Sequence, residues 1–218
     1  VALLSFCTVL INVLVTQVLR GGSKRWMFLI AGVMVLIISH ALGFLLLKDS
    51  DIESETFNVG LVQSNFPQEV KWDPEYSLEM IDKTVDTTRD MLNVTGVDLI
   101  VWPEALVVLP LDSPGVMPRL KGLTTEASAP LFTGISRYVS EKRGWANSSC
   151  VVDERGQVLG YYDKIHLAPF GEYVPLGKYL PFITRVVPAI GEMVPGESPV
   201  VFEIKNRRIG PLICFEVL

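Results

Sequence analysis

The sequence has few residues of the kinds that build metal centres, disulfide frameworks or nucleic-acid-binding surfaces. Its 218 residues include only 2 histidines and 3 cysteines, and no two cysteines have the spacing of a Cys-x-x-Cys metal motif. Lys and Arg number 19 against 24 Asp and Glu, a formal net charge of −5. Because nucleic-acid-binding proteins neutralise phosphates with clustered cations, this balance argues against such a partner. We also expect no metal ion and no other cofactor.

The three cysteines lie in different sequence contexts. Cys7 falls in a long apolar run and Cys150 in a predicted strand, so we expect both to be small buried side chains. Cys214 ends the apolar run 209–213 and is the candidate for a reactive thiol. The tripeptide 147–149 (Asn-Ser-Ser) matches the glycosylation pattern, a match that we attribute to chance.

Apolar residues make up 49% of the chain and are concentrated in the first fifty positions. Residues 1–19 and 27–47 are each almost wholly apolar, and about 20 such residues span the hydrocarbon core of a bilayer as a helix. The connector between them carries three cations and a Trp, which mark the cytoplasmic side. We therefore predict a transmembrane helical hairpin in residues 1–48, with the rest of the chain on the outer face. The alternative for the first run is a signal peptide, but the run lacks the basic leading segment that a signal peptide has.

From residue 57 the pattern changes to short apolar strands separated by longer polar segments. This pattern predicts an α/β domain with a mixed sheet over residues 57–218. The predicted strands are 57–63, 98–102, 131–136, 146–153, 157–161, 200–204 and 208–214, and the predicted helices are 74–93 and 115–128. Position 1 is not Met and the last predicted strand ends close to position 218, so we expect a fragment of a longer protein.

The segment 165–199 is rich in proline and aromatic residues and fits neither a helix nor a strand. A long irregular segment in a compact domain is usually functional or disordered, and the apolar content of this one argues against disorder. We predict an apolar lid or a loop that dips into the membrane.

Three polar residues, Glu104, Lys164 and Cys214, each follow a predicted strand. Loops at the ends of sheet strands are where α/β proteins place their functional side chains. A carboxylate, an ammonium group and a thiol together suffice for covalent acyl chemistry. The carboxylate takes the thiol proton, the sulfur attacks a carbonyl carbon, and the ammonium group stabilises the oxyanion.

The segments around these residues resemble, in the same order, the signature segments of the nitrilase (carbon–nitrogen hydrolase) superfamily. They are 101–104 (Val-Trp-Pro-Glu), 162–167 (Tyr-Asp-Lys-Ile-His-Leu) and 212–216 (Leu-Ile-Cys-Phe-Glu). More narrowly, Trp-Pro-Glu and the whole of 162–175 resemble the apolipoprotein N-acyltransferase family. The resemblance implies a nitrilase-type α-β-β-α sandwich, incomplete at the C-terminus of this chain and preceded by membrane helices.

The resemblance also implies an activity, the transfer of a fatty acyl chain from a phospholipid to the N-terminal amine of a diacylglyceryl-cysteine lipoprotein. Cys214 would carry the acyl chain as a thioester, Glu104 would take the amine proton, and Lys164 with the backbone N–H of Phe215 would bind the oxyanion. The implied location is the bacterial cytoplasmic membrane, with the catalytic domain on the periplasmic face. The expected partners are the bilayer, a phospholipid donor and an apolipoprotein acceptor.

The same resemblance assigns supporting roles to Glu172 and Glu216. Phe215 stands where the family commonly has Tyr, so any hydrogen bond of that hydroxyl is missing here. Three aromatic residues are predicted either to line an acyl pocket or to fill the space beneath the long loop: Phe170, Tyr173 and Phe182. His166 is a second base or, as we prefer, a structural histidine hydrogen-bonded under the loop.

Two other functions are compatible with parts of the sequence. A membrane-bound amidase or nitrilase would use Glu104, Lys164 and Cys214 with water as the acceptor. A non-catalytic membrane receptor or scaffold would keep the fold without the reaction, which the presence of all three residues disfavours.

Overall fold

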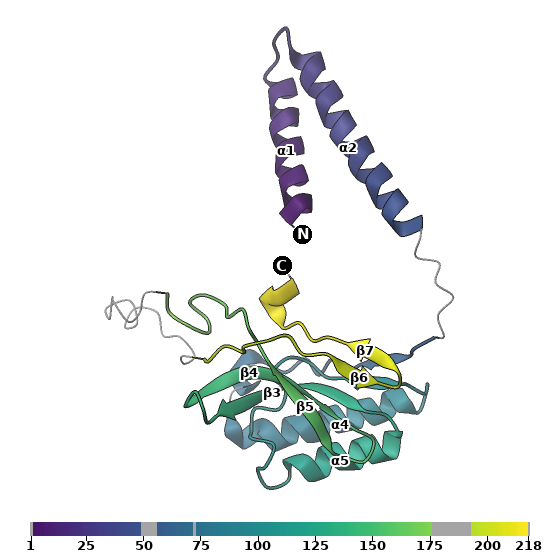
Figure 1. Ribbon diagram of the computed structural model, residues 1–218, viewed down its shortest axis with the longest axis vertical. Helices are drawn as coiled ribbons and strands as arrows, with labels where there is room; N and C mark the ends of the chain where they lie inside the picture. Colours follow the sequence, from purple (N-terminus) through teal and green to yellow (C-terminus); the bar gives the residue numbers. More distant parts are fainter. Residues whose placement is uncertain (1, 49–55, 72, 176–192, 218) are drawn as a thin grey trace. The chain divides into compact units, whose positions relative to one another are not determined.

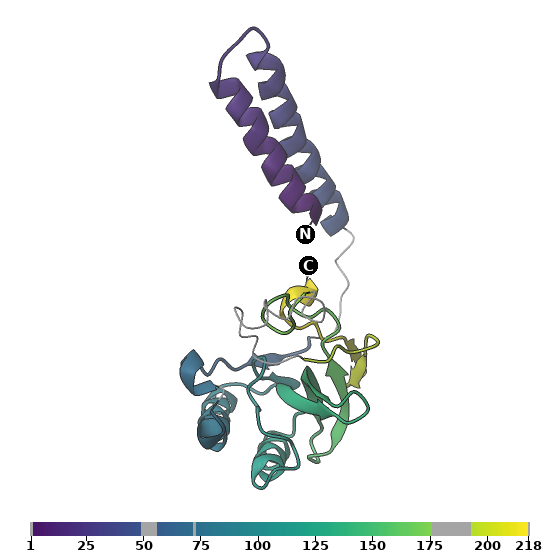
Figure 2. The ribbon, with the colours of Figure 1, turned by 90° about the vertical axis from the view of Figure 1, so that its left-hand side faces the viewer.

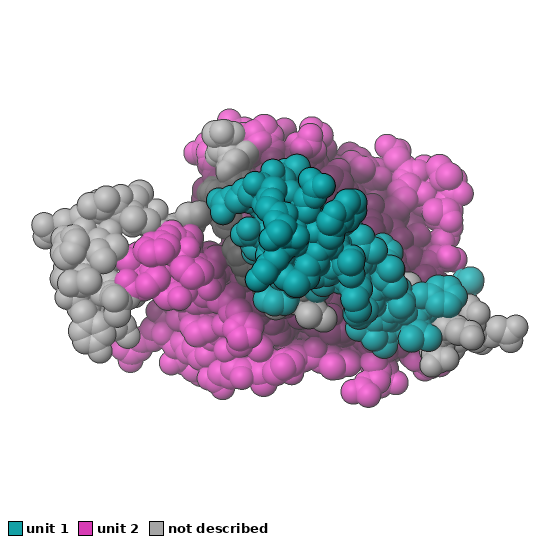
Figure 3. All heavy atoms as spheres, turned by 90° about the horizontal axis from the view of Figure 1, so that it is seen from above, with its two compact units in different colours: residues 1–56, 218 teal, residues 57–217 magenta. Residues whose placement is uncertain are grey.

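The structure, a computed structural model, describes residues 2–48, 56–71, 73–175 and 193–217 (Figure 1). The chain divides into two compact units, residues 1–56 and residues 57–217 (Figure 3).

The N-terminal unit is a pair of helices, α1 (Ala2–Leu19) and α2 (Arg25–Lys48), that run side by side in opposite directions (Figures 1 and 2). Gly32 of α2 lies against Leu14 of α1, with 3.8 Å between the Leu14 Cβ and the place of a glycine Cβ. By length and composition, one helix of the described residues could cross a membrane, Arg25–Leu46; the apolar part of α1, Ser5–Leu19, is shorter. The helical pair is thus present, but a hairpin of two membrane spans is not confirmed.

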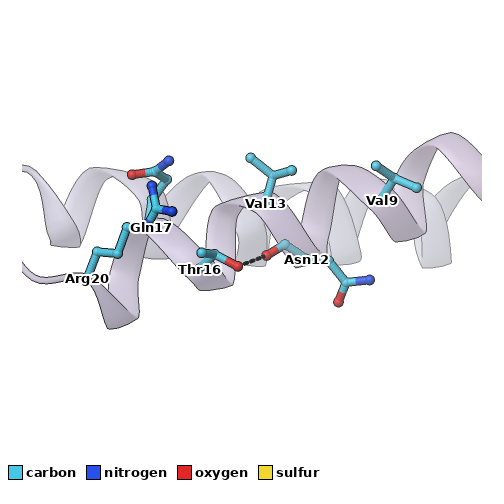
Figure 4. Close-up of a pocket in the computed structure, with 6 residues that line it drawn as sticks. All are labelled: Val9, Asn12, Val13, Thr16, Gln17 and Arg20. Carbon is cyan, nitrogen blue, oxygen red and sulfur yellow. Dashed lines mark hydrogen bonds between the residues drawn. The ribbon is translucent and has the colours of Figure 1, made fainter.

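Helix α1 carries polar side chains within its apolar surface. Asn12, Thr16, Gln17 and Arg20 line a shallow hollow together with two valines (Figure 4). The Thr16 hydroxyl donates a hydrogen bond to the Asn12 carbonyl oxygen at 2.8 Å (Figure 4). A hydroxyl bonded to the preceding turn in this way needs no partner outside its own helix.

The C-terminal unit is built on a five-stranded mixed sheet in the order β1-β2-β3-β4-β5. Strands β1, β2 and β3 run parallel, whereas β3, β4 and β5 are antiparallel neighbours. Their bounds are Val59–Leu61, Leu99–Val101, Leu131–Val139, Gly144–Val152 and Val158–Asp163. The mixed sheet predicted from the sequence is confirmed, and β1 and β2 are shorter than predicted.

The β4–β5 hairpin turns where the sequence predicts it. The Asp153 side chain accepts hydrogen bonds from the backbone N–H groups of Arg155 at 3.0 Å and Gln157 at 2.6 Å. Gly156 has φ +77°, a left-handed conformation that glycine adopts without strain.

Two helices, α4 (Ser77–Leu92) and α5 (Val116–Ala127), cover one face of this sheet (Figures 1 and 2). They bury an apolar stripe against β2, β3 and β4, as the helical periodicity predicts. The helix predicted at 74–93 begins with a separate 3₁₀ turn, Pro74–Tyr76, which follows the short helix α3 (Gln68–Lys71). The Asp73 carboxylate caps this turn through the N–H of Glu75 at 3.0 Å.

The opposite face is covered by a second, two-stranded sheet made of β6 (Phe202–Ile204) and β7 (Arg207–Ile209). Phe202 and Ile204 pack in one apolar cluster with Leu99, Val151 and Tyr162 of the large sheet. The described part of the C-terminal unit is therefore layered as helices, large sheet and small sheet.

The strand predicted at 208–214 is wrong beyond Ile209. Pro211 has no N–H to donate to a strand ladder, so the apolar run 211–213 leaves the sheet instead of extending it. Cys214 consequently does not lie at a strand end. It begins a 3₁₀ turn, Cys214–Val217.

Candidate active site

Lys164 follows β5 directly and is the largest fully buried side chain of the described residues. Its backbone N–H continues the β4–β5 pairing by donating to the Asn147 carbonyl oxygen at 2.9 Å. Its ammonium group, with the side chain 1% exposed, lies 2.9 Å from Oε2 and 3.0 Å from Oε1 of Glu172. A buried ammonium group is costly unless it is paired and hydrogen-bonded, so this contact fixes both side chains.

Glu172 lies on the loop after Lys164, and its carboxylate accepts from three different groups. Besides Lys164, the Ala168 N–H donates to Oε2 at 2.7 Å and the Asn147 Nδ2 donates to Oε1 at 2.8 Å. Burial raises the pKa of Glu172, but the hydrogen bonds from Ala168, Asn147 and Lys164 outweigh it and hold the pKa below its ordinary value. Glu172 is therefore an ionised partner of Lys164.

Glu104 lies on the loop after β2 and is exposed, so its carboxylate is open to an incoming group. Its Oε1 accepts a hydrogen bond from Asn147 Nδ2 at 2.7 Å. The loop lies directly on Gly134 of β3, where a Cβ would stand 2.4 Å from the Ala105 nitrogen and 2.6 Å from the Glu104 Cα. Glycine at this position is what allows Glu104 to approach the sheet so closely.

Asn147 of β4 connects the two carboxylates, because its Nδ2 donates to both Glu104 and Glu172. Asn147 is not among the site residues predicted from the sequence, where its tripeptide only matches the glycosylation pattern. The available signal was the run Asn147-Ser148-Ser149 within an otherwise apolar predicted strand, since polar side chains in a buried strand require partners.

Cys214 stands apart from this network in the described residues: it is exposed, and neither Glu104 nor Lys164 is its hydrogen-bond partner. Its backbone has φ +54°, in the left-handed region. For a residue other than glycine this conformation costs about 1–3 kcal/mol, and such strained residues cluster at active sites.

Glu216 ties the Cys214 segment to the segment after Lys164. Its Oε1 accepts from the Tyr162 hydroxyl at 2.6 Å and from the N–H groups of Ile165 at 2.7 Å and His166 at 3.2 Å. Its Oε2 accepts from the Ile213 N–H at 2.9 Å. Burial raises the pKa of Glu216, but these four hydrogen bonds hold it below its ordinary value. The same carboxylate adds to burial in raising the pKa of Tyr162.

The structure describes only some of the remaining predicted site residues. Phe170 and Tyr173 are exposed on the loop after Lys164, where the Phe170 N–H donates to the Tyr173 carbonyl oxygen at 2.7 Å. Phe182 lies outside the described residues, as does the side chain of Phe215. Acyl-pocket contacts and an oxyanion role for the Phe215 N–H therefore stay predictions. His166 is exposed, and its role as a second base or as a structural histidine stays a prediction.

The other two cysteines differ from Cys214. Cys150 is fully buried in β4, and burial raises the pKa of its thiol to about 12. Cys7 is half-buried in α1. Over residues 2–48, 56–71, 73–175 and 193–217 there is no group of three or more His, Cys, Asp or Glu side chains that could hold a metal ion.

Comparison with known sequences places these features in a family. The model of the carbon–nitrogen hydrolase family matches residues 58–218. The chain is 33% identical to a curated apolipoprotein N-acyltransferase of Geobacter metallireducens, over 98% of this chain and 42% of that protein. It is 33% identical to that of Pseudomonas aeruginosa, over 87% of this chain and 38% of that protein. The resemblance inferred from the sequence is confirmed, and the chain spans less than half the length of these relatives.

Solved structures show the same fold. Nit3 of Saccharomyces cerevisiae, a member of branch 10 of the nitrilase superfamily, is similar with a TM-score of 0.55 and 17% identity, over 77% of this chain and 58% of that one. A CN-hydrolase superfamily protein of Xanthomonas campestris is similar with a TM-score of 0.51 and 18% identity, over 75% of this chain and 55% of that one. With its mixed sheet, its helix layer and a family match over most of its length, the chain belongs to the carbon–nitrogen hydrolase family.

Proposed function

We propose that the protein to which this chain belongs transfers a fatty acyl chain from a membrane phospholipid to the N-terminal amine of a diacylglyceryl-cysteine lipoprotein. The observation that carries the proposal is the hydrogen-bonded network of Lys164, Glu172, Asn147 and Glu104, tied through Glu216 to the Cys214 segment. The name shared by the curated relatives, apolipoprotein N-acyltransferase, supports the choice of an apolipoprotein amine as the acceptor.

In the first step, the Cys214 thiol gives its proton to Glu104 and the sulfur attacks the ester carbonyl carbon of the phospholipid. The carbonyl oxygen becomes an oxyanion, which the Lys164 ammonium group and the Phe215 N–H stabilise. The carbon–oxygen ester bond then breaks, and the lysophospholipid leaves with the proton held by Glu104. The acyl chain remains on Cys214 as a thioester.

In the second step, the lipoprotein amine attacks the thioester carbonyl carbon. Glu104 takes a proton from the amine nitrogen, the carbon–sulfur bond breaks, and the sulfur recovers a proton from Glu104. The products are an amide and the free thiol. Glu172 holds Lys164 in place through both steps and does not need to change its own protonation, because its pKa lies below its ordinary value.

The membrane location belongs to the same proposal. Helix α2 is long and apolar enough to cross a bilayer. We infer residues 1–48 to be a membrane hairpin and residues 57–218 to be a catalytic domain on the periplasmic face of the bacterial cytoplasmic membrane. In the whole protein the catalytic domain would be a complete α-β-β-α sandwich, and the exposed Phe170 and Tyr173 would lie near acyl chains.

The proposal is tested with the full-length protein and a phospholipid that carries a labelled acyl chain. The label should appear on Cys214 as a thioester and then pass to a synthetic diacylated lipopeptide. Cys214→Ala should abolish labelling, whereas Cys150→Ala, at a buried thiol of raised pKa, should retain it. An acylated Cys214→Ala protein would exclude the thioester mechanism. Release of free fatty acid without amide formation would instead favour a hydrolase with water as the acceptor.

A further inference from the structure

Segment 193–196 lies against the residues around the Lys164–Glu172 ion pair. It has three backbone N–H groups, since Pro195 has none, and all three donate to carbonyl oxygens of this region. The bonds run from Met193 to Glu172 at 2.9 Å, from Val194 to Trp145 at 2.8 Å and from Gly196 to Lys164 at 2.9 Å. A segment outside regular secondary structure whose N–H groups are all bonded to one region is held in one position there.

Two of these bonds close a ring around the ion pair. The side chains of Lys164 and Glu172 contact each other directly, and segment 193–196 joins the two residues a second time through their carbonyl oxygens. The Lys164 N–H is bonded as well, to the Asn147 carbonyl oxygen at 2.9 Å. Both backbone groups of Lys164 are therefore fixed, although β5 ends one residue earlier.

Gly196 is the point at which the segment touches the end of β5. A Cβ on Gly196 would stand 2.1 Å from the Asp163 carbonyl oxygen and 2.9 Å from the Asp163 carbonyl carbon. These are backbone atoms, which cannot turn aside as the end of a flexible side chain can. Any residue other than glycine would consequently push either segment 193–196 or the backbone before Lys164 out of place.

Lys142, in the turn between β3 and β4, also contacts this segment. Its ammonium group donates to the Pro195 carbonyl oxygen at 2.5 Å and lies 3.2 Å from the Glu197 carboxylate. The ion pair stabilises little by itself, because the Glu197 side chain is 81% exposed. The hydrogen bond to the Pro195 carbonyl oxygen is therefore the contact that links the β3–β4 turn to segment 193–196.

We propose that segment 193–196 positions Lys164 for oxyanion binding, with Gly196 and Lys142 as the positioning residues. This inference rests on the proposed function, in which the Lys164 ammonium group stabilises the oxyanion. Both positioning residues act through the backbone of Lys164, and neither is assigned a contact with substrate. A shift of that backbone would move the ammonium group away from the oxyanion without removing the reactive thiol or its base.

Two reactions of Cys214 in the full-length protein separate this role from a general loss of structure. Acylation by an activated acyl ester passes through an oxyanion, whereas alkylation by iodoacetamide displaces iodide and forms no oxyanion. Both reactions require the thiol proton to leave. The ratio of the acylation rate to the alkylation rate therefore reports oxyanion stabilisation, and changes in folded fraction, thiol access or base position cancel in it.

The first variants change Lys164 itself and the glycine that contacts the end of β5. Lys164→Met removes the ammonium group and should lower the ratio by about 100-fold or more. Gly196→Ala should lower it by about tenfold to 100-fold, the effect of moving the ammonium group by up to roughly 1 Å. The control is Gly210→Ala, whose Cβ would lie at an ordinary 3.8 Å from the Val200 carbonyl oxygen and which should keep the wild-type ratio.

A second variant, Lys142→Met, tests the same role without adding bulk beside β5. It removes the hydrogen bond to segment 193–196 and should lower the ratio by about threefold to tenfold, the effect of one lost hydrogen bond. Its matched control is Lys205→Met, which breaks an ion pair with Asp98 of the same 3.2 Å length. This control should keep the wild-type ratio.

A wild-type ratio in folded Gly196→Ala would overturn the inference. If that variant does not fold, a wild-type ratio in Lys142→Met would overturn it instead. An equal fall of the ratio in Gly210→Ala or Lys205→Met would do the same, because the effect would then not depend on segment 193–196. A wild-type ratio in Lys164→Met would refute the oxyanion role of Lys164 in the proposed function itself, so the two failures are distinguishable.

Discussion

Replacing Glu216 with Gln should loosen the segment that carries Cys214 without unfolding the domain. One carboxylate accepts four hydrogen bonds from two segments about 50 residues apart in sequence. In Glu216→Gln the amide oxygen can keep the Oε1 position, but the NH₂ group then takes the Oε2 position and cannot accept from the Ile213 N–H. The three remaining bonds become bonds to a neutral oxygen.

The size of the effect follows from these contacts. Hydrogen bonds to charged groups contribute about 1.5–3 kcal/mol each, and neutral ones about 0.5–1.5 kcal/mol. Because Glu216 is only partly buried, we take the low end and expect a local loss of about 2 kcal/mol, or about 30-fold in the opening equilibrium. Amide hydrogen exchange of the full-length protein measures this opening at Ile165, His166 and Ile213.

The control variant is Glu203→Gln, which makes the same chemical change at an exposed glutamate of β6. It should leave the protection of all three amides as in the wild type. Unchanged protection of the Ile213 N–H in Glu216→Gln would show that Glu216 does not hold the segment that carries Cys214. Loss of protection throughout β3 and β4 would equally contradict a purely local role.

Two further predictions concern the position of Glu104 and the ionisation of Glu172. Gly134→Ala places a Cβ 2.4 Å from the Ala105 nitrogen and should slow acylation of Cys214 by about 100-fold, the effect of displacing Glu104 by roughly 1 Å. The control is Gly122→Ala, whose Cβ has no atom within 4 Å and which should be acylated normally. Normal acylation of Gly134→Ala would contradict this role of Gly134. The pKa of Glu172 lies below the ordinary 4.5, so its ionised form stabilises the folded state above pH 4.5 and this contribution is lost as the pH falls through the folded pKa. The difference in unfolding free energy between wild type and Glu172→Gln, measured by urea titration, should therefore shrink below pH 4.5; a constant difference would refute the assignment.

Much of the fold could be predicted because its patterns are local. The helical periodicity of 74–93 and the apolar runs 98–102 and 131–136 predict elements that the structure contains as Ser77–Leu92, Leu99–Val101 and Leu131–Val139. Lys164 and Glu172 could be singled out because segment 162–175 resembles the apolipoprotein N-acyltransferase family. In the structure the two side chains form one ion pair. Their roles in the reaction stay predictions.

What could not be predicted depends on contacts between distant segments. The run after Ile209 is apolar like a strand, but Pro211 cannot continue a ladder, so Cys214 lies in a 3₁₀ turn. Asn147 contacts Glu104 across 43 residues and Glu172 across 25, and no local pattern encodes either separation. The first of the two predicted membrane spans, residues 1–19, is not confirmed, because the apolar part of α1, Ser5–Leu19, is shorter than the apolar part of α2, Arg25–Leu46.

The pairing of Lys164 with Glu172 also has a consequence for how charge would move in the proposed reaction. Within the group of Glu104, Asn147, Lys164 and Glu172, the ammonium group and the Glu172 carboxylate cancel, and Glu104 carries the remaining negative charge. In the proposed first step the Cys214 proton passes to Glu104, so that negative charge would move to sulfur and the number of ions would stay the same. The proposed transfer therefore creates no new pair of opposite charges, so the protein does not have to stabilise an additional ion when the thiol is activated.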